Sequence, residues 1–127
     1  MLPFTDVFLI EDNAGDTVLI RQILAEGADP VKLHIARDGE QAISMLSDGY
    51  FHPTLIIVDL NIPKIDGFAL LERWRDGDIP MVVFSSTLEP TERERALALG
   101  ACEFVAKPSK LEEYIRAVRG ILERWTV

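Results

Sequence analysis

The sequence contains one cysteine, Cys102, and this scarcity excludes two classes of protein at once. A single cysteine cannot form an internal disulfide, and it cannot build a thiolate metal cluster, which needs several such ligands. Cys102 lies in a short apolar segment, where a free cysteine usually packs as a small hydrophobic side chain. We therefore expect Cys102 in the core rather than in a redox role.

Basic residues are also scarce. The 13 Lys and Arg residues are outnumbered by 21 Asp and Glu residues, and the formal net charge is −8. Surfaces that bind nucleic acid or anionic membranes need clustered basic side chains, so we expect neither kind of binding. No apolar run approaches the roughly 20 residues that span a bilayer, and the N-terminus lacks the basic and apolar regions of a signal peptide. Cytoplasm is the expected location.

What the sequence does contain is a series of short apolar runs within 127 residues, a length that suits one domain. Nearly continuous runs are typical of parallel strands that are buried on both faces of a sheet. Such runs lie at residues 7–10, 55–58 and 81–84, and a weaker one lies at 104–106. Residues 31–36 alternate apolar and polar side chains, which predicts a strand nearer the edge of the sheet.

Segments with helical spacing separate these strands. Two of them begin with the pattern of a capping box, Asp38 with Gln41 and Ser109 with Glu112. The other helices are predicted at residues 14–26, at 66–75 and between Pro90 and Gly100, which suit the first turn and the end of a helix. Apolar residues recur at helical spacing along the last helix: Leu111, Tyr114, Ile115, Val118, Ile121, Leu122 and Trp125. For Trp125, a place in or near the core and a place on a self-association surface both stay open.

The predicted order is a strand followed by a helix, repeated five times. Crossovers between parallel strands are right-handed in nearly all cases. Five such units fit a three-layer, doubly wound α/β sandwich, in which helices cover both faces of a parallel sheet. In sheets of this kind, ligands bind at the carboxyl ends of the strands, where the strand order reverses.

Polar side chains follow the predicted strands at that edge. Glu11 and Asp12 follow the first strand, Asp59 the third, Ser85 ends the fourth, and Lys107 follows the fifth. Two like charges about 4 Å apart repel by roughly 4 kcal/mol at an effective dielectric constant near 20. Either one of the three carboxyl groups keeps its proton, therefore, or a cation lies among them.

Hard oxygen ligands with open positions suit Mg²⁺ or Mn²⁺. The predicted ligands are Glu11, Asp12 and Asp59, with the backbone carbonyl of Asn61 completing the protein part of the site. A carboxylate beside such a metal can act as the nucleophile in phosphoryl transfer, which makes Asp59 the candidate phosphoacceptor.

The oxygens of a transferred phosphoryl group need further charge compensation. The Lys107 ammonium and the Ser85 hydroxyl are the candidates for this role.

Four stretches accompany these strand ends: Phe-Leu-Ile-Glu-Asp-Asn at 8–13, Asp-Leu-Asn-Ile-Pro-Lys-Ile-Asp-Gly at 59–67, Phe-Ser-Ser at 84–86 and Phe-Val-Ala-Lys-Pro at 104–108. Together they resemble the receiver domains of bacterial response regulators, and the resemblance covers essentially the whole chain. It implies a flavodoxin-like (βα)5 sandwich with a parallel sheet of strand order 2-1-3-4-5. It also implies that the acidic pair binds Mg²⁺ and that Asp59 is phosphorylated.

The resemblance assigns further roles near the fourth and fifth strands. The hydroxyl residue of the family maps to Ser85 rather than Ser86, because Ser85 stands five positions after Pro80. Phe104 takes the position of an aromatic switch that turns inward when the hydroxyl moves toward the phosphoryl group. The Lys107–Pro108 peptide bond is expected to be cis.

The start Glu-Asp-Asn-x-Gly-Asp, the core Asp-Leu-Asn-x-Pro-Lys and Trp125 narrow the resemblance. They are similar to small single-domain regulators that accompany bacterial phytochrome-type histidine kinases. The expectation is therefore one receiver domain over residues 1–127 with no output domain, which a sensor histidine kinase phosphorylates. The signal would leave through protein contacts: a homodimer, docking to another protein, or a phosphorelay. Such a domain is an enzyme only in the limited sense of Mg²⁺-dependent self-phosphorylation and hydrolysis.

Three other readings compete. A pseudo-receiver would dock to partners without phosphorylation, but it would lack at least one of the site residues. A flavin-binding domain of the same architecture needs a loop after the first strand that cradles a phosphate, where Glu11 and Asp12 would repel one. A haloacid-type phosphatase needs an Asp-x-Asp pattern and an inserted cap, and Asp59-Leu60-Asn61 lacks the second Asp.

Overall fold

Strands and helices alternate along the chain in the computed structural model, which describes residues 5–28 and 30–126. The elements in chain order are β1 Thr5–Ile10, α1 Ala14–Ala25, β2 Val31–Ala36, α2 Gly39–Leu46, β3 Leu55–Val58, α3 Gly67–Trp74, β4 Met81–Ser85, α4 Pro90–Ala98, β5 Glu103–Ala106 and α5 Leu111–Trp125. Within the described ranges, the strands form one parallel sheet in the order β2-β1-β3-β4-β5. The predicted fold and strand order are confirmed, and so is the edge position of residues 31–36.

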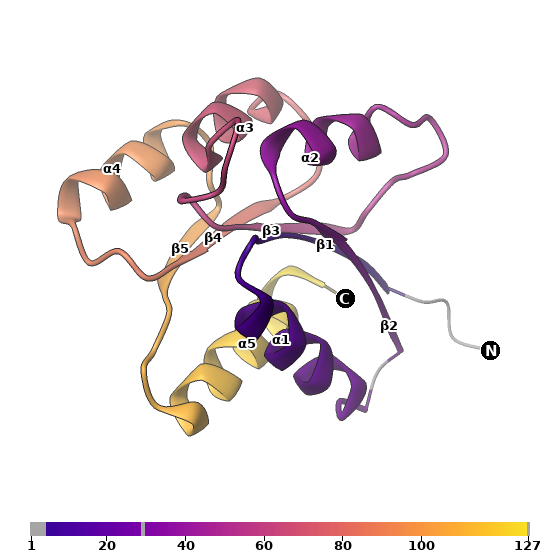
Figure 1. The fold of residues 1–127 in the computed structure, drawn as a ribbon, viewed down its shortest axis with the longest axis vertical. Helices are drawn as coiled ribbons and strands as arrows, with labels where there is room; N and C mark the ends of the chain where they lie inside the picture. The colour runs from indigo at the N-terminus through magenta and orange to yellow at the C-terminus, as the bar shows by residue number, and fades with distance from the viewer. Residues whose placement is uncertain (1–4, 29, 127) are drawn as a thin grey trace.

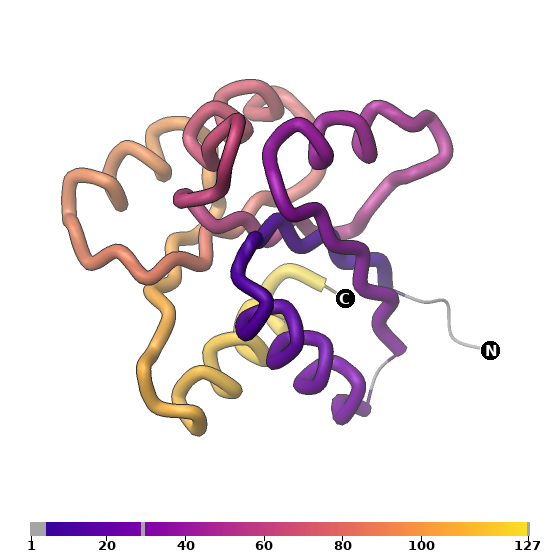
Figure 2. Tube along the Cα trace, in the orientation of Figure 1, coloured from indigo at the N-terminus to yellow at the C-terminus, as the bar shows by residue number. Residues whose placement is uncertain are grey.

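Helices cover both faces of the sheet and make three layers. In the view of Figure 1, α2, α3 and α4 lie above the sheet, and α1 and α5 lie below it. The two lower helices come from opposite ends of the chain, yet they lie side by side (Figure 2). This pairing matters for the site, because each of the two helices carries a side chain that reaches it.

Alternate residues of each central strand enter different cores, which explains why these strands are apolar throughout. In β1, Phe8 and Ile10 pack in the core under α2, α3 and α4. Val7 and Leu9 pack in the opposite core against α1 and α5. The same alternation occurs in β3 and β4, whose residues are all buried. A strand with both faces covered has no solvent side, so its sequence shows no polar alternation.

Side chains cap the helices that lead away from the strand ends. Asn13 accepts a hydrogen bond from the backbone N–H of Asp16 at 2.9 Å, which starts α1. Asp38 accepts one from the backbone N–H of Gln41 at 2.7 Å and starts α2 as predicted. The Gln41 side chain accepts from the backbone N–H of Arg37 rather than from that of Asp38.

Three local predictions are wrong. No capping box forms at Ser109, because α5 begins at Leu111 and its N-cap is Lys110, which makes no side-chain cap hydrogen bond. Cys102 is exposed, because it lies in the bend before β5 and is held there by the hydrogen bond from its backbone N–H to Met81. Lys107–Pro108 is trans, the state that an X-Pro bond ordinarily prefers, and no cis bond occurs in residues 5–28 and 30–126.

The last helix packs through its predicted apolar stripe, except at its first residue. Tyr114, Val118 and Ile121 are buried, whereas Leu111 is exposed. Trp125 packs against the core between the sheet and helices α1 and α5, and its Nε1 donates a hydrogen bond to Glu103 at 2.8 Å. Trp125 therefore lies near the core rather than projecting from the helix. Among the described residues, no helix is both long and apolar enough to cross a membrane.

Candidate functional site

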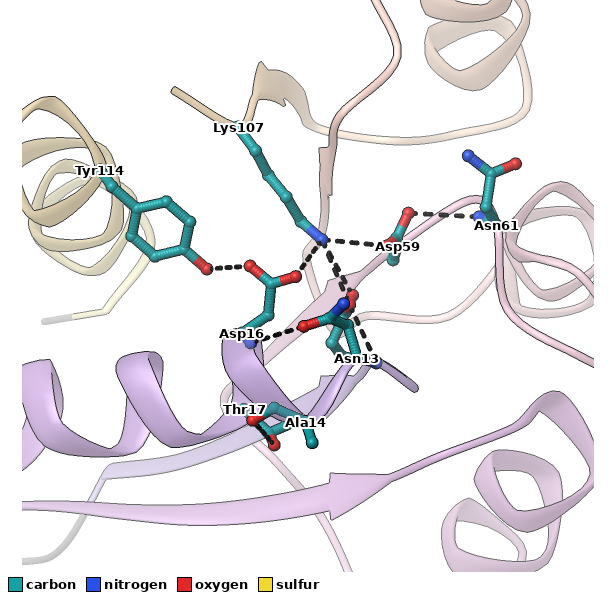
Figure 3. Close-up of polar contacts among 9 residues, drawn as sticks. Asn13, Ala14, Asp16, Thr17, Asp59, Asn61, Lys107 and Tyr114 are labelled. Carbon is teal, nitrogen blue, oxygen red and sulfur yellow. Dashed lines mark hydrogen bonds and ion pairs between the residues drawn. The ribbon is translucent and has the colours of Figure 1, made fainter. Parts of the chain in front are cut away.

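The carboxyl ends of β1, β3, β4 and β5 bring most of the predicted site residues to one edge of the sheet. Asp59 follows β3, which lies between β1 and β4 in the sheet. The Glu11 carboxylate and the Lys107 ammonium reach toward Asp59 from the ends of β1 and β5. Figure 3 shows the Lys107 side chain pointing between Asp59 and Asp16. The topology thus gathers residues that are up to 96 positions apart along the chain.

Three carboxyl groups form a cluster that can hold a cation. One oxygen from each of Glu11, Asp12 and Asp59 lies within 4.8 Å of the other two. Glu11 and Asp59 are buried, whereas Asp12 is exposed, so the cluster opens to solvent on one side. A set of oxygen ligands alone, with an open side for water, fits Mg²⁺ or Mn²⁺.

The Lys107 ammonium contacts three carboxyl groups at once. Its Nζ lies 3.0 Å from Asp59 Oδ2, 3.2 Å from both oxygens of Glu11, and 3.1 Å from Asp16 Oδ2. The backbone N–H of Lys107 also donates to the carbonyl of Ser85 at 2.8 Å, which ties the end of β5 to the end of β4. Charge-assisted hydrogen bonds of this kind are about twice as strong as neutral ones, so they hold the ammonium beside Asp59.

Glu11 and Asp59 differ in the direction of their pKa shifts. Burial raises the pKa of Glu11 from 4.5 to about 8, and the hydrogen bond to Asp59 and the charge of Asp59 act in the same direction. Burial opposes ionisation of Asp59, but the hydrogen bond from Glu11 and the charge of Lys107 outweigh it and lower the pKa of Asp59. Burial also disfavours the charged form of Lys107, yet Asp59 and Glu11 together raise its pKa. In the absence of a bound cation, the shifts in pKa therefore favour an ionised Asp59 and a protonated Glu11.

Ser85 ends β4 and carries a buried hydroxyl group. Its Oγ is the buried side-chain polar atom without a hydrogen bond in the described part of the chain, and the residue is fully buried. Leaving such a group unsatisfied costs about 1–3 kcal/mol, so an incoming acceptor oxygen would be favoured there. Ser86 is exposed, which agrees with the choice of Ser85 as the hydroxyl residue.

The loop after β3 holds Asp59 through its backbone. The N–H of Asn61 donates to Asp59 Oδ1 at 3.2 Å, and Figure 3 shows the Asn61 side chain pointing away from the carboxylate. The Asn61 carbonyl as a metal ligand stays a prediction. Gly67 permits the close packing of this loop on α3, because a Cβ atom there would lie 2.7 Å from the Asp59 carbonyl oxygen.

Phe104, the predicted switch residue, lies in β5 and is 8% exposed. It belongs to the core under α2, α3 and α4. Its movement on phosphorylation stays a prediction.

Two residues of the site were missed by the sequence reasoning. Asp16 in the first turn of α1 contacts Lys107, and the Tyr114 hydroxyl of α5 donates to Asp16 Oδ1 at 2.6 Å. The signal for Asp16 was its place three residues after the cap Asn13, which turns it back toward the strand end. Tyr114 carried no such signal, because an aromatic residue in an apolar stripe usually serves the core alone, and this one also bears a polar tip.

Comparison with known families matches residues 7–119 to the response regulator receiver domain. The chain therefore belongs to the response regulator receiver domain family. Among solved structures, it is similar to the phosphorylated cyanobacterial phytochrome response regulator RcpA, with 30% identity, a TM-score of 0.90, and coverage of 97% of this chain and 94% of RcpA. It is also similar to the Mn²⁺-bound form of response regulator Rcp1, with 28% identity, a TM-score of 0.88, and coverage of 97% and 96%.

Curated relatives are longer proteins. The probable transcriptional regulator ycf27 of Porphyridium aerugineum is 30% identical over 121 residues, which are 93% of this chain and 48% of that protein. A protein-glutamate methylesterase/protein-glutamine glutaminase of Geobacter sulfurreducens is 36% identical over 120 residues, which are 93% of this chain and 32% of that protein. The chain spans about half or less of these relatives, and its likeness to them lies in the receiver domain.

Proposed function

We propose that this chain is a phosphorylation-activated two-component response regulator, in which Asp59 accepts a phosphoryl group from a sensor histidine kinase. One observation carries the proposal: the buried Asp59 carboxyl group belongs to an acidic cluster that can hold a cation, and it also lies 3.0 Å from the Lys107 ammonium. A carboxylate that served only the fold would not need both a cation site and a lysine. The same observation disfavours a pseudo-receiver, because none of the predicted polar side chains is missing.

Glu11, Asp12 and Asp59 would hold Mg²⁺ or Mn²⁺, with the carbonyl of Asn61 as a fourth protein ligand. The similarity to the Mn²⁺-bound Rcp1 structure supports this assignment. A metal bound there would neutralise negative charge on the phosphoryl donor and orient it.

The side chains of this site have separate tasks in the transfer. An oxygen of the Asp59 carboxylate forms a bond to phosphorus while the bond between phosphorus and the donor breaks. Lys107 lies within reach of the charge that gathers on the phosphoryl oxygens, and the Ser85 hydroxyl can donate a hydrogen bond to one of them. The product adds roughly 1.5 to 2 negative charges at Asp59. That change would draw Ser85 and Phe104 into a second arrangement and shift the population of the neighbouring loops and helices.

The similarity to RcpA, a phytochrome response regulator, supports a phytochrome-type histidine kinase as the phosphoryl donor. The signal would leave through protein contacts, as a homodimer, by docking to a partner or in a phosphorelay. The chain would act as a switch that catalyses only its own phosphorylation and the hydrolysis of its phosphoryl group.

Incubation with acetyl phosphate and Mg²⁺, followed by intact-mass measurement, tests the proposal. We expect the wild-type protein to gain one phosphoryl group that hydroxylamine removes. Asp59→Asn, which keeps the size of the side chain and removes its nucleophilic oxygen, should gain none. A wild type that stays unmodified, or an Asp59→Asn variant modified to the same extent, would contradict the proposal. Size measurement with and without beryllofluoride then shows whether activation controls assembly.

A further inference from the structure

Asp16 is held on three sides in the first turn of α1. Its backbone N–H donates to Asn13 Oδ1 at 2.9 Å, its Oδ2 lies 3.1 Å from Lys107 Nζ, and its Oδ1 accepts the Tyr114 hydroxyl at 2.6 Å. Figure 3 shows the Asp16 carboxylate lying between Lys107 and Tyr114. The N-terminal turn of a helix also favours a negative charge. Asp16 therefore has one fixed position, and both of its carboxylate oxygens are engaged.

Asp16 differs from the other two carboxylates that contact Lys107. Glu11 and Asp59 belong to the acidic cluster that can hold a cation, and Asp16 does not. Glu11 and Asp59 would hold a divalent cation in the cluster, so both would then attract the Lys107 ammonium less. Asp16 is then the carboxylate that keeps attracting Lys107, and it pulls the ammonium from the side of α1.

Tyr114 extends this chain of contacts to α5. The residue is 6% exposed, and its ring packs edge-on against Phe84 with centroids 5.2 Å apart. Phe84 precedes Ser85 in β4, so the ring lies beside the strand that carries the buried hydroxyl. A shift of the Asp16 carboxylate would change the hydrogen bond of a phenol that is otherwise fixed by packing.

We propose that Asp16 is a positioning residue that holds the Lys107 ammonium beside Asp59 when a divalent cation is bound, and that its hydrogen bond from Tyr114 couples the state of Asp59 to α5. The inference rests on the proposed phosphorylation of Asp59. When the phosphoryl group attracts Lys107, the ion pair between Lys107 and Asp16 weakens. The Asp16 carboxylate can then shift, and its hydrogen bond from Tyr114 passes that shift to α5. This route lies on the face of the sheet opposite to the core that contains Phe104.

The first test compares Asp16→Asn with Glu112→Gln. The Asn variant keeps an acceptor oxygen for Tyr114 but loses the charge that attracts Lys107, while Glu112→Gln removes an exposed acid from the first turn of α5. Rates of phosphorylation are measured against acetyl phosphate concentration at saturating Mg²⁺. We expect Asp16→Asn to lower the maximal rate about fivefold or more, with a smaller change in the half-saturating donor concentration. The reason is that the variant loses a charged hydrogen bond that positions Lys107 for the transition state.

A spectroscopic measurement separates this inference from the proposed function. In the presence of Mg²⁺ alone, the ¹⁵N resonance of the Lys107 ammonium should show slow proton exchange in the wild type and fast exchange in Asp16→Asn. Equal maximal rates within about a factor of two, together with an unchanged Lys107 resonance, would overturn the positioning role. A wild type that is never phosphorylated would instead contradict the proposed function, and the Lys107 resonance would still decide the role of Asp16.

The coupling to α5 is tested by Tyr114→Phe, which removes the hydroxyl and keeps the ring. Backbone amide shifts are recorded with and without beryllofluoride. We expect the shifts in α5 to fall to less than about half of their wild-type size, while those around Ser85 persist. If Tyr114→Phe does not fold, Asp16→Ala removes the acceptor from the other side and gives the same comparison. Shifts in α5 of wild-type size in the folded variant would overturn the coupling.

Discussion

Lys107 and Ser85 approach the same predicted phosphoryl position from two neighbouring strand ends, yet their surroundings are opposite. The Lys107 ammonium contacts three carboxyl groups, whereas the buried Ser85 hydroxyl has no hydrogen-bond partner among the described residues. The lysine side is thus organised by charge before any phosphoryl group arrives. On the other side, the Ser85 hydroxyl is a donor that an oxygen of the phosphoryl group could accept from. Removing the Lys107 charge should therefore lower the free energy of unfolding, whereas removing the Ser85 hydroxyl should raise it.

The largest effect is expected from Lys107→Met, which removes the charge and keeps the apolar stem. Breaking a buried set of ion pairs leaves uncompensated carboxylates and costs about 3 to 5 kcal/mol. We expect the free energy of unfolding without metal to fall by this amount at pH 7, and Mg²⁺ to restore part of it. Urea unfolding with and without Mg²⁺ measures both. A variant as stable as the wild type in the absence of metal would show that the lysine is not organised by charge.

The pH dependence of stability should follow Glu11. Its pKa is raised from 4.5 to about 8 in the folded state, so its protonated form stabilises the fold. That stabilisation is complete below pH 4.5 and is lost as the pH rises through about 8. We expect the free energy of unfolding of the metal-free protein to fall by about 3 to 4 kcal/mol from pH 5 to 8.

Glu11→Gln, which cannot ionise, is the matched variant for this prediction. Its unfolding free energy should be nearly constant over the same pH range, and Mg²⁺ should no longer stabilise it appreciably. If the variant kept the slope of the wild type, another group would carry the titration.

Ser85→Ala should have the opposite sign to Lys107→Met. Removing a buried hydroxyl that has no partner relieves its desolvation cost, so we expect the unmodified protein to become more stable by about 1 kcal/mol. The same variant should lose most of the amide shifts that beryllofluoride causes around β4 and α4. Ser86→Ala, at an exposed position, is the control and should change neither property. A destabilised Ser85→Ala would indicate a hydrogen-bond partner for the hydroxyl in solution.

The smallest effect is expected from Cys102→Ser, because this residue belongs to neither the Lys107 side nor the Ser85 side of the site. Because the Cys102 side chain is exposed, the change should alter stability by no more than about 0.5 kcal/mol and leave phosphorylation unchanged. A thiol reagent should react with the native wild-type protein at the rate of a free thiol. Slow reaction would place Cys102 in the core, as its apolar neighbours in the sequence had indicated.

Much of the site was predictable because the carboxyl ends of parallel strands lie at the same edge of a sheet, where ligands bind. Glu11, Asp59 and Lys107 directly follow or end buried runs, and right-handed crossovers leave few ways to arrange those runs. The sequence also predicted that three neighbouring carboxyl groups would repel one another when ionised. The raised pKa of Glu11 agrees with that prediction. Roles that depend on movement or on a bound ion, such as those of Phe104 and the Asn61 carbonyl, stay predictions.

Other features depended on contacts between distant segments. The capping box at Ser109 was a sound local pattern, but the chain enters α5 one residue later, at Lys110. Cys102 has apolar neighbours, yet its place in the bend before β5 exposes it. A residue pattern describes neighbours along the chain, whereas burial depends on where the next element lies.

The sequence by itself determined the alternation of strands and helices, the sheet edge that carries the chemistry, and the charged residues placed there. These features follow from local periodicity and from the rule that parallel strands share their carboxyl ends. Only the tertiary structure decided that Asp16 and Tyr114, 98 residues apart, meet beside Lys107, and that the buried Ser85 hydroxyl has no partner within residues 5–28 and 30–126. The reason is physical: hydrogen bonds between α1 and α5 exist only after both helices have packed on the same face of the sheet.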